Sequence, residues 1–544
     1  MSARWRWWWT PLVFLALAAL WTWPAGLAAL SPGDRLVGRH FDVPASLWFL
    51  GSSPRLLLSL TDPMTGWPDG VTYGRPDSFT VLALGWALQW LHPARVYGAL
   101  QILGVAGTAW AAEAFAREVG ARAPWSLLAG IAVGFCGLAS TALLEGYVYH
   151  VLAPWLPLFA LFWWRACRGG PSGEGTTRDG LLAGLMFSLT LLTTAYLGLA
   201  AGLLLVGFAA GGLLRRSISV RAWAGAAAVA VPAVGLYVAA FAAGGGESAP
   251  PETAWEVSSL GRSAHLLAMA GPTASQDRFA HSASATTPAV ALCLALAAPV
   301  ALRALPRWRA LAATGFGALV LSMGPLLGSP ELPLGPLPLS LLADLPGHEL
   351  LRFPGRLGWA WVICGGALAG RVATELAPRA GRPALALFAF ALVDLFLVER
   401  LPLRQHLQVG TTPSAYGAHE GPVLDLFPEE LSRVYEFDAW AQARSCYHQL
   451  EHGRPIASDC VITRSEANPG WQKSRALNGL LLAGDAAGAE ALLRGWDFET
   501  VALRPDFYRP GDRAKVQATL STLDPTPAVS TDGGEHLVAY RVPP

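Results

Sequence analysis

Residues 31–78 read SPGDRLVGRHFDVPASLWFLGSSPRLLLSLTDPMTGWPDGVTYGRPDS and directly follow the first strongly apolar segment of the chain. Pro, Gly and aromatic residues are scattered through this stretch, and its aspartates are Asp34, Asp42, Asp62, Asp69 and Asp77. The remainder of residues 1–400 is mostly apolar and uncharged. A long acidic loop after a first apolar span is where we expect chemistry at a membrane surface.

The composition is that of a membrane protein. Charged residues make up 14% of the 544 positions and hydrophobic residues 53%, whereas soluble proteins carry about 25% charged residues. The 23 tryptophans fit membrane–water interfaces, where Trp is enriched. The net charge of +1 gives no reason to expect a nucleic-acid partner. Most of the chain is therefore expected to be solvated by membrane lipid.

The N-terminus has the basic start of a signal peptide, with Arg4 and Arg6 ahead of the apolar run Trp7–Leu30. That run is longer than the roughly 7–15 apolar residues of a signal peptide. We therefore expect an uncleaved anchor that spans the membrane. Cleavage near Ala29 is the alternative.

Eleven segments are long and apolar enough to span, since a helix needs about 20 apolar residues. The expected spans are residues 7–29, 96–116, 124–143, 148–165, 180–194, 196–213, 222–243, 288–303, 310–328, 357–373 and 383–399. The apolar segment 79–91 is short, and we interpret it as a re-entrant or interfacial helix. With the N-terminus in the cytoplasm, this topology places nearly all span-flanking arginines inside, as the positive-inside rule requires.

Lys473 and Lys515 are the only lysines, and Ala and Gly are abundant, which is typical of proteins from GC-rich bacterial genomes. The predicted architecture is a polytopic α-helical membrane domain over residues 1–400, in a bacterial cytoplasmic (inner) membrane. Its outer loops are 31–95, 244–287 and 329–356. Residues 401–544 are more polar and are expected to form an extracytoplasmic α/β domain that supports or positions a substrate. Strands are expected in SRVYEFDAW, CVITRSE, FETVALRP and HLVAYRV, and a helix in AGDAAGAEALLRGW. Cys446 and Cys460 can form a disulfide if this domain is extracytoplasmic, and the sequence leaves both states open.

Asp42 and Asp34 are the candidate catalytic residues. A carboxylate at the membrane–water boundary can act as general base for an acceptor hydroxyl. Turn capping or solvation is the alternative for any single loop aspartate.

His150 opens a span in EGYVYHVLAPWLPL, where Glu145 and Tyr149 accompany it as candidate pocket-lining residues. Its imidazole is expected to bind a phosphate, to pair with a loop aspartate or to serve as an interfacial anchor. Tyr73 and Arg75, in the turn-rich segment WPDGVTYGRPDS, are further candidates for lining a pocket.

Arg352 and Arg356, in HELLRFPGRLGW, enter a span from the outer side against the positive-inside bias. Arginine presents a bidentate fork to phosphate oxygens, so both are candidates for binding a donor phosphate. Pairing with Asp344 or Glu349 is the alternative.

These features together resemble the bacterial GT-C superfamily of polytopic glycosyltransferases. The resemblance is carried by the first span followed by GRHFDVPASLWF and the WPDG turn, by EGYVYHVLAPWLPL and LRFPGRLGW, and by the C-terminal α/β region. It implies an inverting enzyme that takes a sugar from a polyprenyl-phosphate donor on the outer face. An aspartate of the first outer loop would be the base, and it matches Asp42 best and Asp34 second.

The resemblance implies a lipid-linked sugar donor and an envelope glycan, lipid or protein as acceptor. Some members depend on a divalent cation and others do not, and no ligand cluster in this sequence decides between them. Two other classes remain as alternatives: a transporter or flippase for a lipid-linked glycan, and a non-catalytic envelope assembly protein. Ionisable residues within the spans are scarce, which counts against transport.

Overall fold

The computed structural model describes residues 3–243, 306–380 and 406–543 apart from shorter gaps, chiefly 27–34, 39–41, 73–77, 168–175, 215–218, 343–353, 429–434 and 461–467. The contacts divide the chain into two units. The first comprises residues 1–27, 74–81 and 98–405, and the second comprises 28–73, 82–97 and 406–544. The sequence-based division assigned the loop 31–95 to the membrane domain, whereas most of that loop packs with the C-terminal residues.

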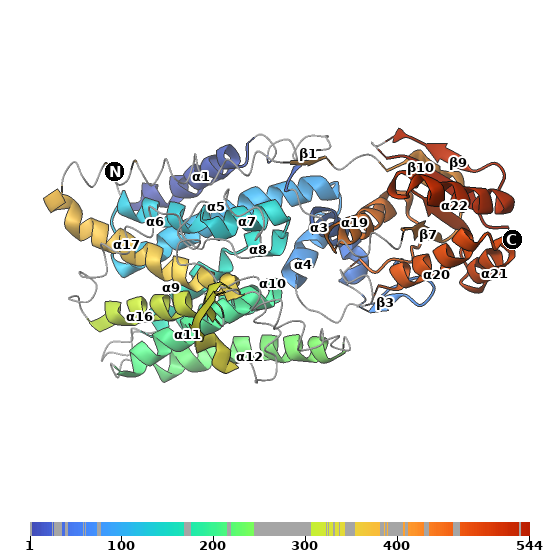
Figure 1. Cartoon of the computed structure of the whole chain (residues 1–544). Helices are drawn as coiled ribbons and strands as arrows, with labels where there is room; N and C mark the ends of the chain where they lie inside the picture. Colours follow the sequence, from blue (N-terminus) through green and yellow to red (C-terminus); the bar gives the residue numbers. More distant parts are fainter. Residues whose placement is uncertain are drawn as a thin grey trace. The chain divides into compact units, whose positions relative to one another are not determined.

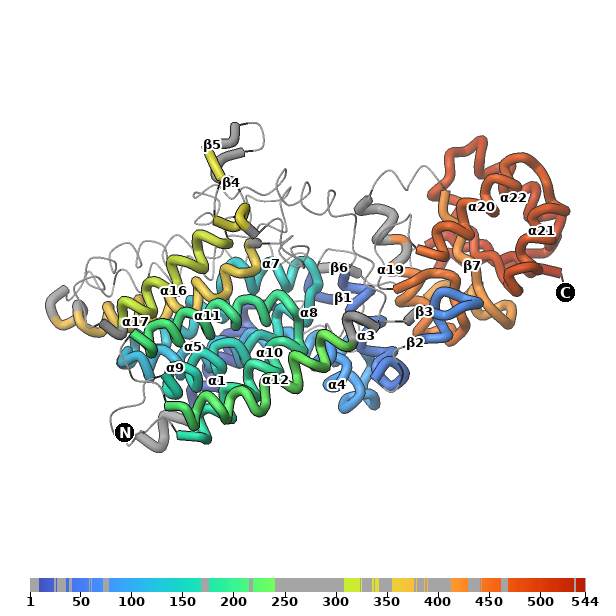
Figure 2. Tube along the Cα trace, turned by 90° about the horizontal axis from the view of Figure 1, so that it is seen from below, coloured from blue at the N-terminus to red at the C-terminus, as the bar shows by residue number. Residues whose placement is uncertain are grey.

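The first unit is built of helices that run roughly parallel to one another (Figures 1 and 2). They are α1 (Ala3–Trp21), most of α5 (Pro93–Val119), α6 (Trp125–Gly134), α7 (Gly137–Glu145), α8 (Val148–Val151), α9 (Trp155–Ala166), α10 (Thr177–Thr193), α11 (Ala195–Leu214), α12 (Val220–Ala243), α16 (Pro306–Ser322) and α17 (Gly358–Ala380). A short hairpin, β4 (Leu326–Ser329) with β5 (Leu332–Pro336), and the 3-10 turns η3 (Pro338–Leu342) and η5 (Pro354–Leu357) complete it.

Five segments of the described chain are long and apolar enough to cross a membrane. They are Pro93–Val119, Trp125–Glu145, Ala195–Leu214, Val220–Ala239 and Gly355–Glu375. The chain is thus rich in helices with several candidate spans, as predicted, although these five do not establish the expected number of eleven. The expected spans 288–303 and 383–399 lie outside the described residues.

Small residues allow these helices to approach closely, as is common between helices in lipid. A Cβ atom added at Gly130 of α6 would lie 2.6 Å from the carbonyl oxygen of Ala109 in α5. One added at Gly370 of α17 would lie 2.9 Å from the carbonyl oxygen of Trp125. Larger side chains at these glycines would push the helices apart.

The segment predicted to be re-entrant or interfacial contains α4 (Phe79–Ala87), a helix of 9 residues. This is less than half of the roughly 20 residues that a span requires. Trp86 and Trp90, within and just after it, are 46% and 73% exposed.

The second unit contains a four-stranded sheet in the order β7-β8-β10-β9. β7 (Val423–Leu426) is parallel to β8 (Thr500–Leu503), while β10 (Leu537–Arg541) pairs antiparallel with both β8 and β9 (Ala528–Ser530). The helices of this part are α19 (Tyr435–His452), α20 (Pro469–Ala483), α21 (Ala486–Gly495) and α22 (Pro510–Leu523), with the 3-10 turns η8 (Ser414–Ala418) and η10 (Pro505–Phe507). The C-terminal α/β character agrees with the prediction.

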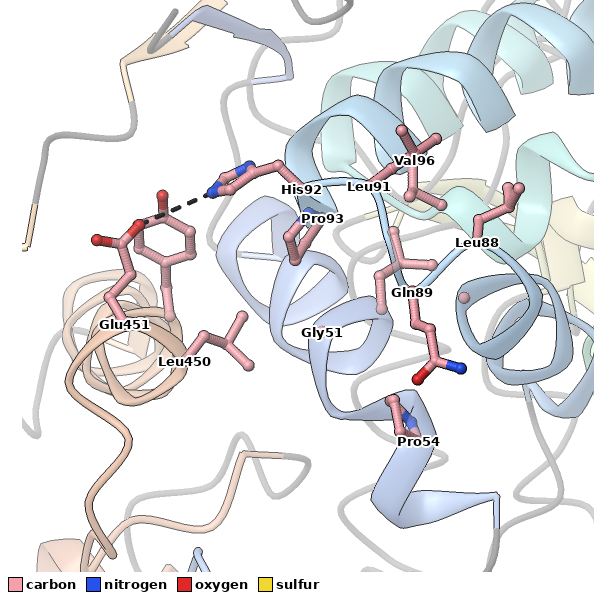
Figure 3. Close-up of a pocket in the computed structure, with 13 residues that line it drawn as sticks. Gly51, Pro54, Leu88, Gln89, Leu91, His92, Pro93, Val96, Leu450 and Glu451 are labelled. Carbon is pink, nitrogen blue, oxygen red and sulfur yellow. Dashed lines mark ion pairs between the residues drawn. The ribbon is translucent and has the colours of Figure 1, made fainter. Parts of the chain in front are cut away.

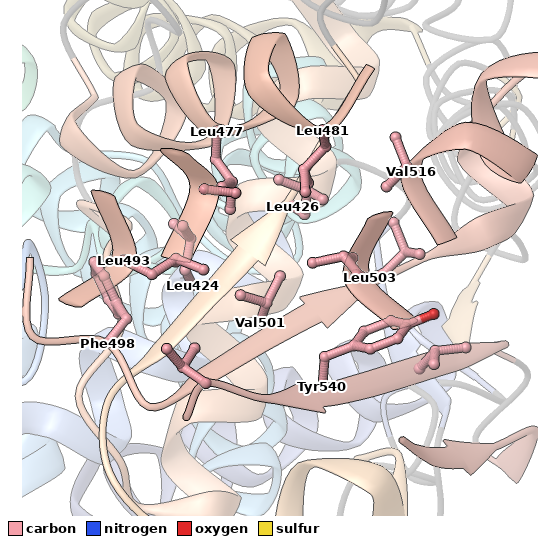
Figure 4. Packing of buried hydrophobic residues seen from close by; sticks show 14 of the residues in the cluster. Leu424, Leu426, Leu477, Leu481, Leu493, Phe498, Val501, Leu503, Val516 and Tyr540 are labelled. Carbon is pink, nitrogen blue, oxygen red and sulfur yellow. The ribbon is translucent and has the colours of Figure 1, made fainter. Parts of the chain in front are cut away.

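Alternate residues of each strand face opposite sides of this sheet, and each side is covered. Leu424, Leu426, Val501 and Leu503 pack with Leu477, Leu481, Leu493 and Val516 of α20, α21 and α22 (Figure 4). The intervening positions Val423, Ala502 and Ala539 pack with Cys446 of α19 and with Trp48. The sheet is therefore the middle of three layers.

Trp48 comes from α3 (Asp42–Leu56), in the loop after the first apolar segment. It is fully buried, and its Nε1 donates to Oε1 of Gln449 in α19 at 3.3 Å. Further along the loop, the Gly66 amide donates to the Ser458 carbonyl at 3.1 Å. The short strands β1 (Arg35–Val37) and β6 (His406–Gln408) pair antiparallel, and β2 (Thr61–Asp62) pairs with β3 (Val71–Thr72). The first loop is thus an integral part of the second unit.

Two details of the C-terminal region are settled by the fold. Cys446 and Cys460 form a disulfide, so one of the two states left open by the sequence is realised. The strand expected in SRVYEFDAW is wrong, because residues from Tyr435 onward form α19. The expected strand in CVITRSE lies largely outside the described residues.

A buried ionic network joins α19 to the sheet. Arg504 pairs with Asp425 at 2.8 Å and with Glu535 at 3.1 Å, and Glu535 also pairs with Arg444 of α19 at 2.6 Å. Burial alone would raise the pKa of the Glu535 carboxyl, but His448 and the two arginines outweigh burial and lower that pKa. Each of these charges would be costly to bury alone, and the network stays buried because each charge is paired.

Candidate functional site

A polar cluster lies in the first unit around His150, in the short helix α8. His150 is 3% exposed, and neither of its ring nitrogens has a hydrogen-bond partner among the described residues. Its ring lies 5.5 Å from that of Tyr147, 4.9 Å from that of Tyr149 and 5.7 Å from that of Tyr196. Buried polar groups are nearly always hydrogen-bonded, so this imidazole is a group that a polar ligand can satisfy.

Arg356, in η5, belongs to the same cluster although 206 positions separate it from His150 in the chain. Its guanidinium carbon lies 4.2 Å from the ring centre of Tyr196 and 5.1 Å from that of Tyr147. Both distances are in the cation–π range. The two tyrosines thus contact both the histidine and the arginine, which brings two candidate phosphate-binding residues into one aromatic surround.

The cluster lies at one end of the helices of the first unit. His150 precedes α9, Arg356 precedes α17, and Tyr196 is in the first turn of α11. Arg165, in the last turn of α9, pairs with Glu118 at 2.7 Å, and Arg371, in the C-terminal half of α17, donates to the Gly120 carbonyl just beyond α5 at 2.8 Å. These two arginines therefore lie toward the end of the helix bundle opposite to the His150–Arg356 cluster.

Gln101, in α5, is a functional candidate that the sequence reasoning missed. It is fully buried, and neither atom of its amide has a hydrogen-bond partner among the described residues. A single glutamine within an apolar span was the available signal, but its lack of a partner can be read only from the fold.

Asp42 is placed separately, in the second unit, as the first residue of α3. It is half-buried, and the N-terminus of a helix favours a negative charge. Asp34 lies outside the described residues, immediately before β1. The pairing of β1 with β6 and the start of α3 hold the chain on either side of residues 39–41.

Known proteins were searched for sequences and structures similar to this chain. No protein-family model matches the sequence, and no curated protein sequence matches it. Solved structures do match. An arabinofuranosyltransferase, AftD from Mycobacteria, aligns over 100% of this chain with a TM-score of 0.61 and 16% identity. ArnT from Cupriavidus metallidurans, solved bound to undecaprenyl phosphate, aligns over 97% of both chains with a TM-score of 0.50 and 13% identity.

The chain has the GT-C glycosyltransferase fold. An oligosaccharyltransferase from Archaeoglobus fulgidus, solved tethered to an acceptor peptide, also matches, with a TM-score of 0.50 and 10% identity. This match covers 94% of this chain and 70% of the oligosaccharyltransferase chain. The fold that the resemblance implied is thereby confirmed. The chain spans only 40% of the length of AftD.

The other predicted site residues fall into two groups. Glu145, at the end of α7, is buried, and Tyr149 is half-buried against His150. Arg352, Tyr73 and Arg75 lie outside the described residues, so their roles stay predictions.

A cavity of about 490 Å³ lies within the second unit, between α3, α19 and the turn after α4 (Figure 3). Its walls are mostly apolar, with Leu50, Leu88 and Leu450 among them. At its rim His92 and Glu451 approach to 3.8 Å, and the interaction with His92 lowers the pKa of the Glu451 carboxyl. No predicted site residue lines this cavity.

Among the residues that the structure describes, no group of three or more His, Cys, Asp or Glu side chains is arranged to hold a metal ion. We therefore assign no metal ligands.

Proposed function

We propose that this protein is a membrane glycosyltransferase. It transfers a sugar from a polyprenyl-phosphate donor to an envelope glycan, lipid or protein on the extracytoplasmic face of a bacterial inner membrane. The observation that carries the proposal is the cluster in which Arg356 and the buried His150, which has no hydrogen-bond partner in the described part of the chain, share Tyr147 and Tyr196. The GT-C fold supports it, as does the undecaprenyl phosphate bound by ArnT.

Two features support the placement of this cluster on the outer face. Arg165 and Arg371 mark the opposite helix ends, and the positive-inside rule assigns arginine-rich ends to the cytoplasm. The Cys446–Cys460 disulfide supports an extracytoplasmic C-terminal domain, because disulfides persist in oxidising compartments. The same topology leaves the N-terminus in the cytoplasm.

The donor phosphate is assigned to Arg356 and His150, with Arg352 as the second arginine from the same stretch of sequence. A guanidinium can donate two parallel hydrogen bonds to phosphate oxygens. Stacking on Tyr196 limits the motion of the Arg356 side chain. A fixed positive charge of this kind favours departure of the lipid phosphate, since it matches charge that develops in the transition state.

The acceptor is activated by a carboxylate of the first outer loop, for which Asp42 is the first choice and Asp34 the second. The carboxylate accepts the proton of the acceptor hydroxyl. The hydroxyl oxygen then forms a bond to the anomeric carbon of the sugar. The bond between that carbon and the phosphate oxygen breaks, and its electron pair leaves with the polyprenyl phosphate.

Transfer from labelled polyprenyl-phosphate sugars by the purified protein tests the proposal. We expect transfer by the wild type, a loss of at least a hundredfold in either Asp42→Asn or Asp34→Asn, and little change in Asp69→Asn, an exposed aspartate of the same loop. Full activity in both Asp42→Asn and Asp34→Asn would remove the base assignment. Failure of the wild type with every donor would favour a flippase or an assembly protein.

A further inference from the structure

The proposed donor-phosphate site of Arg356 and His150 gives no role to Gln101. This side chain is 0% exposed, and its Nε2 and Oε1 atoms have no hydrogen-bond partner among the described residues. A primary amide carries two N–H donors and one carbonyl acceptor. Leaving them unsatisfied in an apolar span costs folding free energy, so this residue is poorly suited to a purely structural role.

The packing of α5 shows which segment Gln101 faces. A Cβ atom at Gly104 would lie 2.6 Å from the carbonyl oxygen of Val151, and one at Gly107 would lie 3.3 Å from the ring of Pro154. Residues three apart lie on the same side of a helix. Gln101 therefore belongs to the side of α5 that packs on the segment 151–154.

α5 and the segment 151–154 run in the same direction, because Gly104 lies against Val151 and, three residues later in both, Gly107 lies against Pro154. Gln101 lies one turn before Gly104 in α5, and from the same direction of contacts we expect it to face the start of this segment. Val148 is the first residue of α8, the four-residue helix that carries His150. The amide of Gln101 and the imidazole of His150, neither of which has a partner among the residues described, thus belong to adjoining elements at one end of the bundle.

The donors and the acceptor of the Gln101 amide indicate which kind of ligand it can bind. A fully ionised phosphate offers only acceptors, so it can satisfy the Nε2 of Gln101 but not the Oε1. A sugar hydroxyl both donates and accepts a hydrogen bond, and neighbouring hydroxyls on one ring can engage both atoms of the amide. A hydrocarbon chain can satisfy neither atom.

We propose that Gln101 binds the sugar hydroxyls of the lipid-linked donor and thereby distinguishes a sugar-loaded polyprenyl phosphate from the bare lipid phosphate. This inference rests on the proposed function and deepens it by assigning a specificity-determining residue. A site built to hydrogen-bond a hydroxyl discriminates strongly against a ligand that lacks it, because its own polar groups are then left unpaired.

The test measures Tm and ligand affinity of the purified full-length protein. The probes are undecaprenyl phosphate and its mannosyl and arabinofuranosyl esters, with wild type, Gln101→Leu and Thr108→Val. Thr108 is a matched control because it is buried in the same helix and its hydroxyl already donates to the Gly104 carbonyl at 2.7 Å. We expect the wild type and Thr108→Val to bind one sugar ester about tenfold more tightly than the bare phosphate.

In Gln101→Leu we expect the bare phosphate to bind as in wild type, the preference for the sugar ester to vanish, and the Tm without ligand to stay equal or rise. A sugar preference retained in Gln101→Leu, or a lower Tm without ligand, would overturn the inference and make Gln101 structural. If the wild type binds the bare phosphate but prefers no ester, this inference fails while the donor-phosphate site stands. If neither lipid binds the wild type, the proposed function itself fails.

Discussion

Replacing both Cys446 and Cys460 by alanine removes a cross-link whose ends are 14 residues apart in the chain. The chain-entropy account assigns a closed loop of about 15 residues roughly 3 kcal/mol of stabilisation at 25 °C. Both cysteines are buried in the layer between α19 and the sheet. Alanine therefore keeps the site apolar, and loss of the cross-link is the main expected effect.

Amide hydrogen exchange of the full-length protein measures how much the cross-link stabilises α19 and the sheet. Because about 1.4 kcal/mol corresponds to a factor of ten, exchange in α19 should accelerate by about a hundredfold in the double variant. Cys364→Ala is the matched control, since this buried cysteine of α17 forms no disulfide with any cysteine that the structure describes. Reductant should also expose two additional thiols in the unfolded wild type.

Exchange in α19 that changes by less than about threefold in the double variant would refute the reasoning. So would an equal number of reactive thiols with and without reductant. The second result would also remove one of the two supports for an extracytoplasmic C-terminal domain.

Three further predictions concern packing and charge. Burial and the nearby Arg454 lower the pKa of His452 to about 3, so the folded state takes up its proton only well below the ordinary pKa of about 6.5. The contribution of neutral His452 to the stability of the second unit is therefore fully present above about pH 6.5 and is lost as the pH falls toward 3. The Tm should drop between pH 7.5 and 5, and a flat profile would contradict this. Arg504→Met leaves Asp425 and Glu535 buried without this partner, so it should lower the free energy of unfolding, measured by chemical denaturation, by about 3–5 kcal/mol. Arg494→Met removes only an exposed ion pair and should lower that free energy by less than about 1 kcal/mol. Gly104→Leu should disrupt α5 packing and lower both Tm and transfer, because its Cβ would lie 2.6 Å from the Val151 carbonyl oxygen. Gly202→Ala is its control, since no described atom lies within 4 Å of a Cβ at Gly202, and equal effects of the two variants would argue against the close approach of α5.

The sequence predicted what depends on composition and local pattern. Long apolar runs predicted helices such as α11 and α12, and alternation in HLVAYRV predicted β10. The pattern failed at SRVYEFDAW, where Val434, Tyr435 and Phe437 favour a strand locally. The chain continues into a long helical segment, and packing of α19 against the sheet decides the structure there.

Non-local features needed the fold. The sequence nominated His150 and Arg356 independently, but their shared contacts with Tyr147 and Tyr196 depend on the packing of separate helices. Trp48 could be recognised as a loop tryptophan, whereas its burial against α19 could not. Gln101 shows the same limit, because an unsatisfied amide is a property of its surroundings and not of its identity.

The binding of undecaprenyl phosphate to the purified protein in nanodiscs tests the central claim most directly. Removing one charge-assisted hydrogen-bonding group costs about 1.5–3 kcal/mol, so Arg356→Met should raise Kd by about 10- to 150-fold. Arg309→Met, which removes an exposed arginine of α16, should leave Kd unchanged. A Kd for Arg356→Met within twofold of wild type would contradict the assignment of this cluster to the donor phosphate.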